Sequence, residues 1–99
     1  MVYMGKKLKS LRIEKNYTQK QISERIGLAI SAVSSYESGA RYPSYDVLVK
    51  LSRIYHVSTD YLLGVTSQRT IDVSDLDNEE IELVSQLVEK FRKLHNTRN

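Results

Sequence analysis

Cysteine is absent from this chain of 99 residues, and its absence excludes several kinds of chemistry. Without thiols the protein forms no disulfide, no thiolate zinc site and no cysteine nucleophile. Histidine is scarce as well, because the two histidines, His56 and His95, are far apart in the sequence. We therefore expect no metal site, no other cofactor and no small-molecule ligand. We also find no set of nucleophile, base and acid from which an enzyme could be built.

Long hydrophobic runs are also missing. The N-terminal stretch MVYMGKKLKS has too few consecutive apolar residues for the core of a signal peptide, and lysines follow at once. No stretch is long enough for a transmembrane helix. The sequence therefore predicts a cytoplasmic protein that does not bind a membrane. Its apolar residues, 40% of the chain, suffice for one small core.

Charge is distributed unevenly along the chain. Residues 1–65 contain ten Lys or Arg and five Asp or Glu, which gives +5, whereas residues 66–99 contain five and seven, which gives −2. A basic first part favours binding to a polyanion, and a mildly acidic tail favours a segment that does not touch it. This balance alone is weak evidence, because many ordinary domains carry a similar charge.

Helical periodicity begins near the N-terminus. A first helix is expected from about Met4 to Lys15, with Leu8 and Leu11 on its inner side. Asn16 is expected to end this helix in a left-handed conformation.

Two short helices with a glycine between them follow. Thr18 and Gln21 have the spacing of a capping box at the start of a helix over Gln19–Ile26. Gly27 suits the sharp turn after it, and a third helix is expected over Ile30–Ser38. This pair has the size of a helix-turn-helix motif, over about residues 19–38. In such a motif the second helix enters the major groove of DNA.

Two more helices follow a loop that contains the chain's only proline, Pro43. The fourth helix is expected to start near Ser44, and its inward apolar residues are Val47, Leu48, Leu51 and Ile54. A short fifth helix would be capped by Ser58 or Thr59 and ended by Gly64. The first unit is therefore expected to contain five short helices and no strand.

The remaining residues predict a linker and one helix. Residues 65–76 are polar and lack helical periodicity, whereas Asp77 and Glu80 have the spacing of a capping box. The helix would run to about Leu94 within the segment 77–99. Its large apolar residues form one broad stripe: Ile81, Val84, Leu87, Val88, Phe91 and Leu94. This stripe could pack on its own chain or on a second copy, and we favour dimerisation because the unit 1–64 is compact without it.

The segment TQKQISERIGLAISAVSSYESGARYPS, residues 18–44, resembles the XRE family of helix-turn-helix regulators, which includes Cro and phage repressors. The positions that match the family pattern are Thr18, Gln19, Ile22, Gly27, Leu28, Val33, Ser34, Tyr36, Glu37, Gly39, Arg41 and Pro43. With VSTDYLLG, which looks like the family's closing helix, the resemblance covers residues 4–64. It implies an all-α fold: a lambda-repressor-like five-helix DNA-binding domain over 1–64, then the linker and the C-terminal amphipathic helix.

The resemblance also implies roles for individual residues. The expected DNA-binding positions are Thr18, Gln19, Lys20, Ile30, Ser31, Ser34, Ser35 and Arg41. Gln19 would contact a backbone phosphate and brace the first base-reading residue, and Arg41 would contact a phosphate or the minor groove. Arg12 and Glu37 would form a structural salt bridge.

The expected reading helix departs from the family in two ways. Ala29 stands where the family often has Ser or Thr, so the helix would lack a side-chain cap. Its outward positions hold Ile30 and serines in place of Gln, Asn, Lys or Arg, which predicts modest base selectivity. Taken by themselves the serines could be solvated surface, but within this motif we favour DNA contact. Ile30 could contact a thymine methyl or lie at the edge of the core.

The function that these features favour is a dimeric transcriptional repressor. Two reading helices about 34 Å apart would engage successive turns of the major groove at a palindromic operator of double-stranded DNA. The alternative is an antitoxin or another protein-interaction module, in which the C-terminal helix binds a partner protein.

Overall fold

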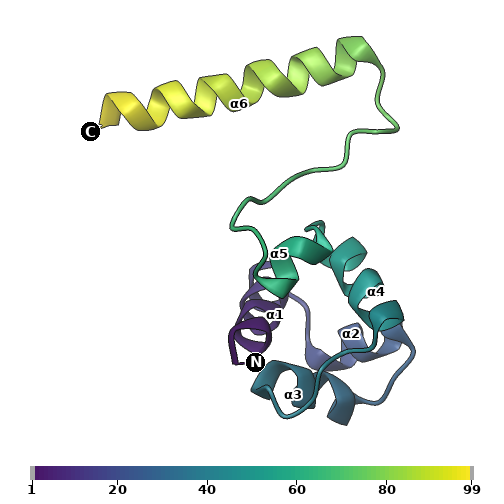
Figure 1. The fold of residues 1–99 in the computed structure, drawn as a ribbon. Helices are drawn as coiled ribbons and strands as arrows, with labels where there is room; N and C mark the ends of the chain where they lie inside the picture. The colour runs from purple at the N-terminus through teal and green to yellow at the C-terminus, as the bar shows by residue number, and fades with distance from the viewer. Residues whose placement is uncertain (1, 99) are drawn as a thin grey trace.

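The computed structural model describes residues 2–98. That range is all-helical and contains no strand, and its helices are α1 (Val2–Glu14), α2 (Gln19–Ile26), α3 (Ile30–Ser38), α4 (Tyr45–Tyr55), α5 (Thr59–Leu63) and α6 (Asn78–Arg98). The first five gather in one bundle, and α6 stands away from it beyond an extended linker (Figure 1). Residues 1 and 99, the outer ends of the predicted ranges 1–64 and 77–99, lie outside the described residues. None of the described helices is both long and apolar enough to cross a membrane.

The first helix is longer at its start than the sequence predicts. It begins at Val2, ahead of the expected Met4, which is the first buried apolar residue of the helix. No capping residue marks the start of the helix in the sequence. It ends at Glu14, and the prediction for Asn16 is confirmed by its left-handed φ of 62°. The Asn16 amide donates to the carbonyl of Ile13 at 3.0 Å, which closes the helix.

The bounds of α2 and α3 are as predicted, and their ends follow from local chemistry. The capping box is confirmed, because Thr18 Oγ1 accepts from the Gln21 amide at 3.1 Å and Gln21 Oε1 accepts from the Thr18 amide at 2.8 Å. Gly27 ends α2 with a φ of 73°, a conformation that glycine adopts without a steric penalty. Ala29 precedes α3 and makes no side-chain capping bond, also as expected.

Similar caps define α4 and α5. The hydroxyl of Ser44 caps α4, and His56 ends that helix in a left-handed conformation with a φ of 54°. Of the two candidate caps for α5, Ser58 accepts the hydrogen bond and Thr59 is the first helical residue. Ile54 was expected to face inward, but it is only partly buried and packs against the edge of the core.

The core lies where α1 packs on α3. The second helix, α2, contacts α3 and α4, and α5 contacts α1 and α4. Its buried apolar residues are Met4, Leu8, Leu11, Ile22, Ile26, Ala32, Val33, Tyr36, Val47, Leu48, Leu51, Tyr55, Val57 and Leu62. The crossing is close because Gly5 faces the last turn of α3. A Cβ atom at position 5 would lie 2.5 Å from the carbonyl oxygen of Glu37. The core therefore fixes the position of α3 relative to α1.

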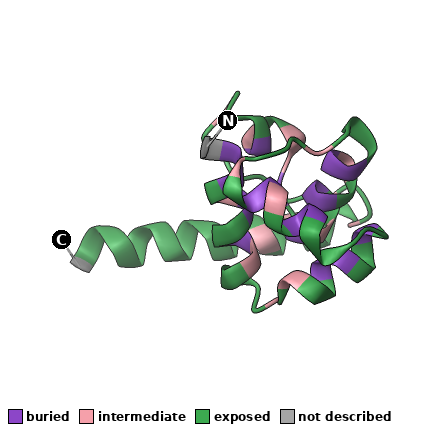
Figure 2. Ribbon diagram, turned by 90° about the horizontal axis from the view of Figure 1, so that it is seen from below, coloured by how far each residue is buried: buried purple, intermediate pink, exposed green. Residues whose placement is uncertain are grey.

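The C-terminal helix, α6, begins with its own capping box, and most of its residues are exposed to solvent. Asp77 and Glu80 form the predicted capping box, with distances of 3.0 Å from the Asp77 amide to Glu80 Oε1 and 2.8 Å from the Glu80 amide to Asp77 Oδ1. The helix continues to Arg98, beyond the expected end near Leu94, since its last turn contains no Gly or Pro that would stop it. Most of its surface is exposed (Figure 2).

Candidate DNA-binding surface

A buried cluster of three side chains holds the two helices of the predicted motif together. Arg12 on α1 donates to both carboxylate oxygens of Glu37 on α3, with Nε–Oε2 at 2.7 Å and Nη2–Oε1 at 3.0 Å. Gln19, the first residue of α2, donates from Nε2 to the same carboxylate at 3.1 Å. Arg12 also donates from Nη1 to the carbonyl of Tyr17 at 3.0 Å. The expected ion pair is therefore present, and it extends to α2 and to the loop before it.

The cluster is electrostatically strong because it is shielded from water. The side chains of Arg12 and Glu37 are only 13% and 5% exposed. The hydrogen bond from Glu37 raises the pKa of the Arg12 guanidinium above its ordinary value, and burial opposes that shift. Burial, together with the Glu37 carboxylate, also raises the pKa of the neighbouring Tyr55 phenol. The only charge on α3 is thus neutralised inside the protein.

The side-chain amide of Gln19 is the part of this cluster that the residues alone did not reveal. The resemblance gave Gln19 a phosphate contact and a bracing role. In the structure its side chain is half-buried and braces Glu37, near the C-terminal end of α3. The spacing of polar residues along the chain gives no sign of this contact, since Gln19 and Glu37 lie on different helices.

The N-terminal ends of α2 and α3 each leave backbone amides available to a ligand. In α2 the amides of Gln21 and Ile22 bond to Thr18, which leaves those of Gln19 and Lys20 without a partner in the helix. In α3 no side chain caps the first turn. Exposed amides at a helix N-terminus attract anions such as phosphate.

The outward face of α3 carries the small residues that the sequence placed there. Ile30, Ser31 and Ser34 are exposed and Ser35 is half-buried, whereas Val33 and Tyr36 are buried on the opposite side. Ile30 is 46% exposed, so it does not belong to the core. Short hydroxyls and one aliphatic chain permit a close approach to DNA and a contact with a thymine methyl, but no bidentate reading of a base.

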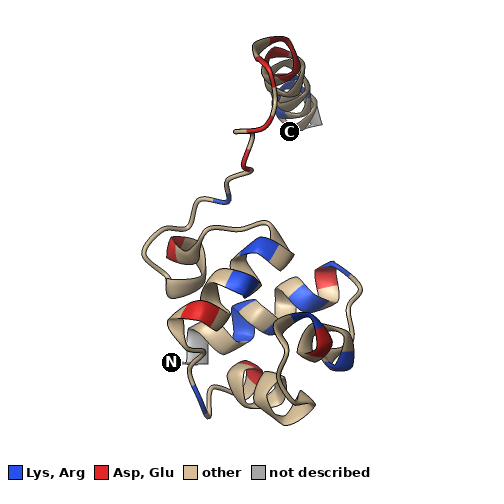
Figure 3. Ribbon diagram, turned by 90° about the vertical axis from the view of Figure 1, so that its right-hand side faces the viewer, with Lys and Arg blue, Asp and Glu red and all other residues tan. Residues whose placement is uncertain are grey.

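The loop after α3 brings Arg41 beside this face. The amides of Ala40 and Arg41 both donate to the carbonyl of Ser35, at 3.0 and 3.2 Å, so the loop folds back on the helix. Arg41 and Lys20 are both exposed. Figure 3 shows that basic residues also lie on the other helices of the bundle. The predicted DNA-binding positions thus belong to α2 and its N-cap Thr18, to α3 and to the loop that follows α3.

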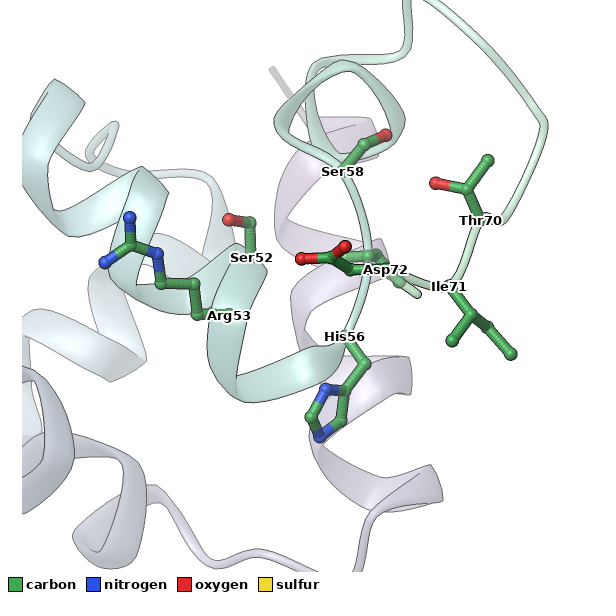
Figure 4. Close-up of a pocket in the computed structure, with 8 residues that line it drawn as sticks. Ser52, Arg53, His56, Ser58, Thr70, Ile71 and Asp72 are labelled. Atoms are coloured by element: carbon green, nitrogen blue, oxygen red, sulfur yellow. The ribbon is translucent and has the colours of Figure 1, made fainter. Parts of the chain in front are cut away.

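A separate pocket of about 400 Å³ lies at the other end of α4, where the linker passes over it. Figure 4 shows Arg53 and His56 on one side and Asp72 of the linker near them. None of the predicted DNA-binding residues lines this pocket. Within residues 2–98 no group of His, Asp and Glu is arranged to hold a metal ion.

The linker is tied to the bundle on another side. Arg69 donates to both carboxylate oxygens of Glu14 at 3.2 and 2.9 Å, and its guanidinium lies 5.8 Å from the centre of the Tyr61 ring. The Lys7 ammonium lies over the same ring and donates to the carbonyl of Tyr61 at 2.7 Å. The Arg69–Glu14 pair lowers the pKa of the Glu14 carboxyl, but it is exposed and screened by water.

Comparison with known proteins identifies relatives of this arrangement. The HTH-type transcriptional regulator ImmR of Bacillus subtilis (strain 168) is 42% identical over 78 residues, which cover 79% of this chain and 61% of ImmR. The cryptic phage CTXphi transcriptional repressor RstR of Vibrio cholerae is 30% identical over 92 residues, which cover 85% of this chain and 82% of RstR. The chain thus spans less than two thirds of ImmR but most of RstR.

Solved structures give the same result for the fold. The P22 c2 repressor protein, in complex with its synthetic operator 9T, superposes with a TM-score of 0.60 at 26% identity. That match covers 63% of this chain and 94% of the repressor chain. Residues 8–62 match the family model described as helix-turn-helix, which is more than half of the chain. The protein therefore belongs to the helix-turn-helix family, as the resemblance of residues 18–44 to XRE regulators predicted.

Proposed function

We propose that this protein is a transcriptional repressor that binds double-stranded DNA, with the outward face of α3 in the major groove. The observation that carries the proposal is the joining of α2 and α3 through the Arg12–Glu37–Gln19 cluster, which presents the neutral face of α3 as one rigid surface. Lys20, Arg41 and the free amides at the start of α2 flank that face and would bind phosphates. The names of RstR as a repressor and of the P22 protein as an operator-bound repressor support the same function.

The proposal includes a dimer that acts in the cytoplasm without catalysis. The stripe of α6 is exposed: Leu87, Val88, Phe91 and Leu94 are 52%, 40%, 53% and 49% accessible. Because complete burial of a large apolar side chain is worth about 1.5–3 kcal/mol, covering the exposed half of each is worth roughly 1 kcal/mol. A second copy would bury the stripe and present two reading helices to a palindromic operator. Repression would follow from occlusion of the polymerase.

The binding experiment begins with selection of duplexes from random DNA, which identifies the operator sequence. Fluorescence anisotropy on a selected duplex would then measure affinity as salt rises from 50 to 200 mM. We expect the affinity to fall by about a thousandfold if some six phosphates are contacted. An affinity that does not change with salt would contradict the phosphate-dominated account. A reporter gene behind the selected site would show whether binding lowers or raises transcription.

Two substitutions separate positioning contacts from base reading. Arg41→Ala should weaken binding to every duplex alike, because a phosphate contact carries no sequence information. Arg53→Ala removes another exposed arginine, at the pocket end of α4, and is the matched control. Ser31→Ala should change affinity little. A large loss for Ser31→Ala on one duplex only would show that α3 reads bases directly.

The second candidate function is that of an antitoxin or other module whose α6 binds a different protein. It is favoured by the same exposed stripe, since nothing in the described residues covers it. Light scattering on the purified full chain distinguishes the two. A monomer that binds DNA would favour a separate partner for α6. A dimer that becomes a monomer with Phe91→Glu, but stays a dimer with Gln86→Glu, would favour self-association.

A further inference from the structure

The charges of α6 are segregated along its length. Its first turns carry Glu79, Glu80 and Glu82, directly after Asp75 and Asp77 of the linker end. Its second half carries four basic residues, Lys90, Arg92, Lys93 and Arg98, against one acidic residue, Glu89. The helix therefore has an acidic end and a basic end.

The apolar stripe of α6 has a second kind of order, because it is symmetric about its own centre. The midpoint between Leu87 and Val88 is the point of symmetry. Reversal of the helix about that point exchanges Ile81 with Leu94 and Val84 with Phe91. A helix with such spacing presents the same row of apolar positions in either direction. Two copies can therefore pair in the antiparallel direction with every apolar position still in contact.

We propose that α6 pairs with α6 of a second copy in the antiparallel direction, centred between Leu87 and Val88. The proposal rests on the dimer in the proposed function and adds its direction and register. The two-fold axis then sets Ile81 against Leu94 of the second copy, Val84 against Phe91, and Leu87 against Val88. Among antiparallel registers, this one sets each of the six stripe residues against another stripe residue.

Charge decides between the two directions. In a parallel pair the acidic first turns of both helices would lie side by side, as would the two basic halves, and like charges at this range repel. In the antiparallel pair each acidic end lies along a basic half. Glu80 directly precedes the stripe and His95 directly follows it. The same symmetry exchanges these two residues, so they face each other across the pair. The charge pattern thus favours the direction that the stripe permits.

The arrangement also fits two half-sites on DNA. With a rise of 1.5 Å per residue, the starts of the two helices in this register lie roughly 30 Å apart, at opposite ends of the pair. A parallel pair would bring both starts to within about 10 Å of each other. The antiparallel pair therefore sends the two linkers out with a separation close to the roughly 34 Å between successive major-groove faces. Residues 65–76 of each linker contain no helix, so they could bridge the remaining distance between the end of α6 and its half-site.

Spin labels test the direction of pairing, and the chain is suited to them because it has no native cysteine. Glu79→Cys and Gln86→Cys place single labels on the face of α6 away from the stripe, one near the end and one near the centre. The full-length chain would carry one label at a time, and electron double resonance would measure the distance between the copies. We expect the distance at position 79 to exceed that at 86 by roughly 10 Å.

Each other outcome of this experiment contradicts the proposal. Equal distances at both positions would indicate a parallel pair. The absence of any distance between copies would show that α6 is covered by its own bundle or by another protein. Anisotropy of the same labelled chains on a selected duplex reports DNA binding separately. Loss of DNA binding with the two distances intact would refute the proposed function and leave the pairing in place.

Charge reversal gives an independent test through rescue. Glu80→Lys should raise the dimer dissociation constant about tenfold, since the change occurs at both ends of the pair. Glu80→Lys combined with His95→Glu should restore most of that loss, although the capping box of α6 stays broken. Glu79→Lys makes the same charge change off the stripe and is the matched control. Failure of His95→Glu to rescue Glu80→Lys in sedimentation measurements would overturn the register.

Discussion

A single hydrogen atom in place of a methyl group decides how closely α1 approaches α3. A Cβ at Gly5 would lie 2.5 Å from the Glu37 carbonyl oxygen and 2.8 Å from that of Tyr36, and backbone cannot move aside as a side chain can. Alanine in place of glycine within a helix normally stabilises it by about 1 kcal/mol. Here we expect Gly5→Ala to destabilise the protein by about 1–3 kcal/mol, as overpacked sites do. Urea unfolding would measure this, with Ser10→Ala on the exposed side of α1 as control. A Gly5→Ala protein as stable as the parent would show that the crossing is looser than described.

The buried pair of Arg12 and Glu37 and the exposed pair of Arg69 and Glu14 predict different losses of stability when the carboxylate is removed. Glu37→Ala would leave the Arg12 guanidinium, 13% exposed, without its carboxylate and Gln19 without its acceptor. We expect a loss of about 3 kcal/mol or more, because a buried charge without a partner is expensive. Glu14→Ala breaks the Arg69 pair, whose side chains are 44% and 49% exposed, and should cost less than about 1 kcal/mol. Chemical denaturation would measure the free energy of unfolding of both variants. Similar losses of stability for Glu37→Ala and Glu14→Ala would contradict this prediction.

At the scale of the element, the sequence predicts helices best where a cap or a glycine marks the end. Thr18, Gly27 and Ser44 act through bonds to their own neighbours, so their effects can be inferred from adjacent residues. The start of α1 and the end of α6 lack such marks, and there the helices extend about two and about four residues beyond the predicted bounds. The bond between Gln19 and Glu37 depends on how α2 and α3 are packed, which no local pattern specifies.

The uncapped start of α3 gives the prediction at this scale. Ala29 has the extended conformation of an N-cap residue, with a φ of −70° and a ψ of 155°, but no side chain that can accept from the first turn. Ala29→Ser should supply that acceptor and stabilise the protein by about 1 kcal/mol. Thermal unfolding would measure it, and Ala40→Ser in the exposed loop after α3 is the control. An unchanged midpoint would indicate that solvent already satisfies those amides fully.

For the whole molecule, the arrangement of parts explains how a reading helix without long polar side chains could still be selective. In Figure 1, α3 lies at the end of the bundle remote from α6, so the proposed DNA contact and the proposed pairing do not compete for the same surface. Selectivity can then arise from the spacing of two half-sites and from DNA shape, in addition to the few base contacts that Ile30 and its neighbouring serines offer.

Because pairing and DNA contact use different surfaces, we predict a much higher affinity for a duplex with two half-sites than for a duplex with one. Joining two weak contacts through one dimer makes the second contact intramolecular, which raises overall affinity by about 10²–10⁴. Phe91→Glu places a charge in the exposed stripe of α6 and should abolish that gain on a palindromic duplex. On a single half-site the same variant should bind as the parent does, because α3 is unchanged. Anisotropy with the two duplexes measures both effects, and Gln86→Glu controls for the added negative charge. An equal loss on both duplexes would mean that α6 supports the fold of the bundle or contacts the DNA itself.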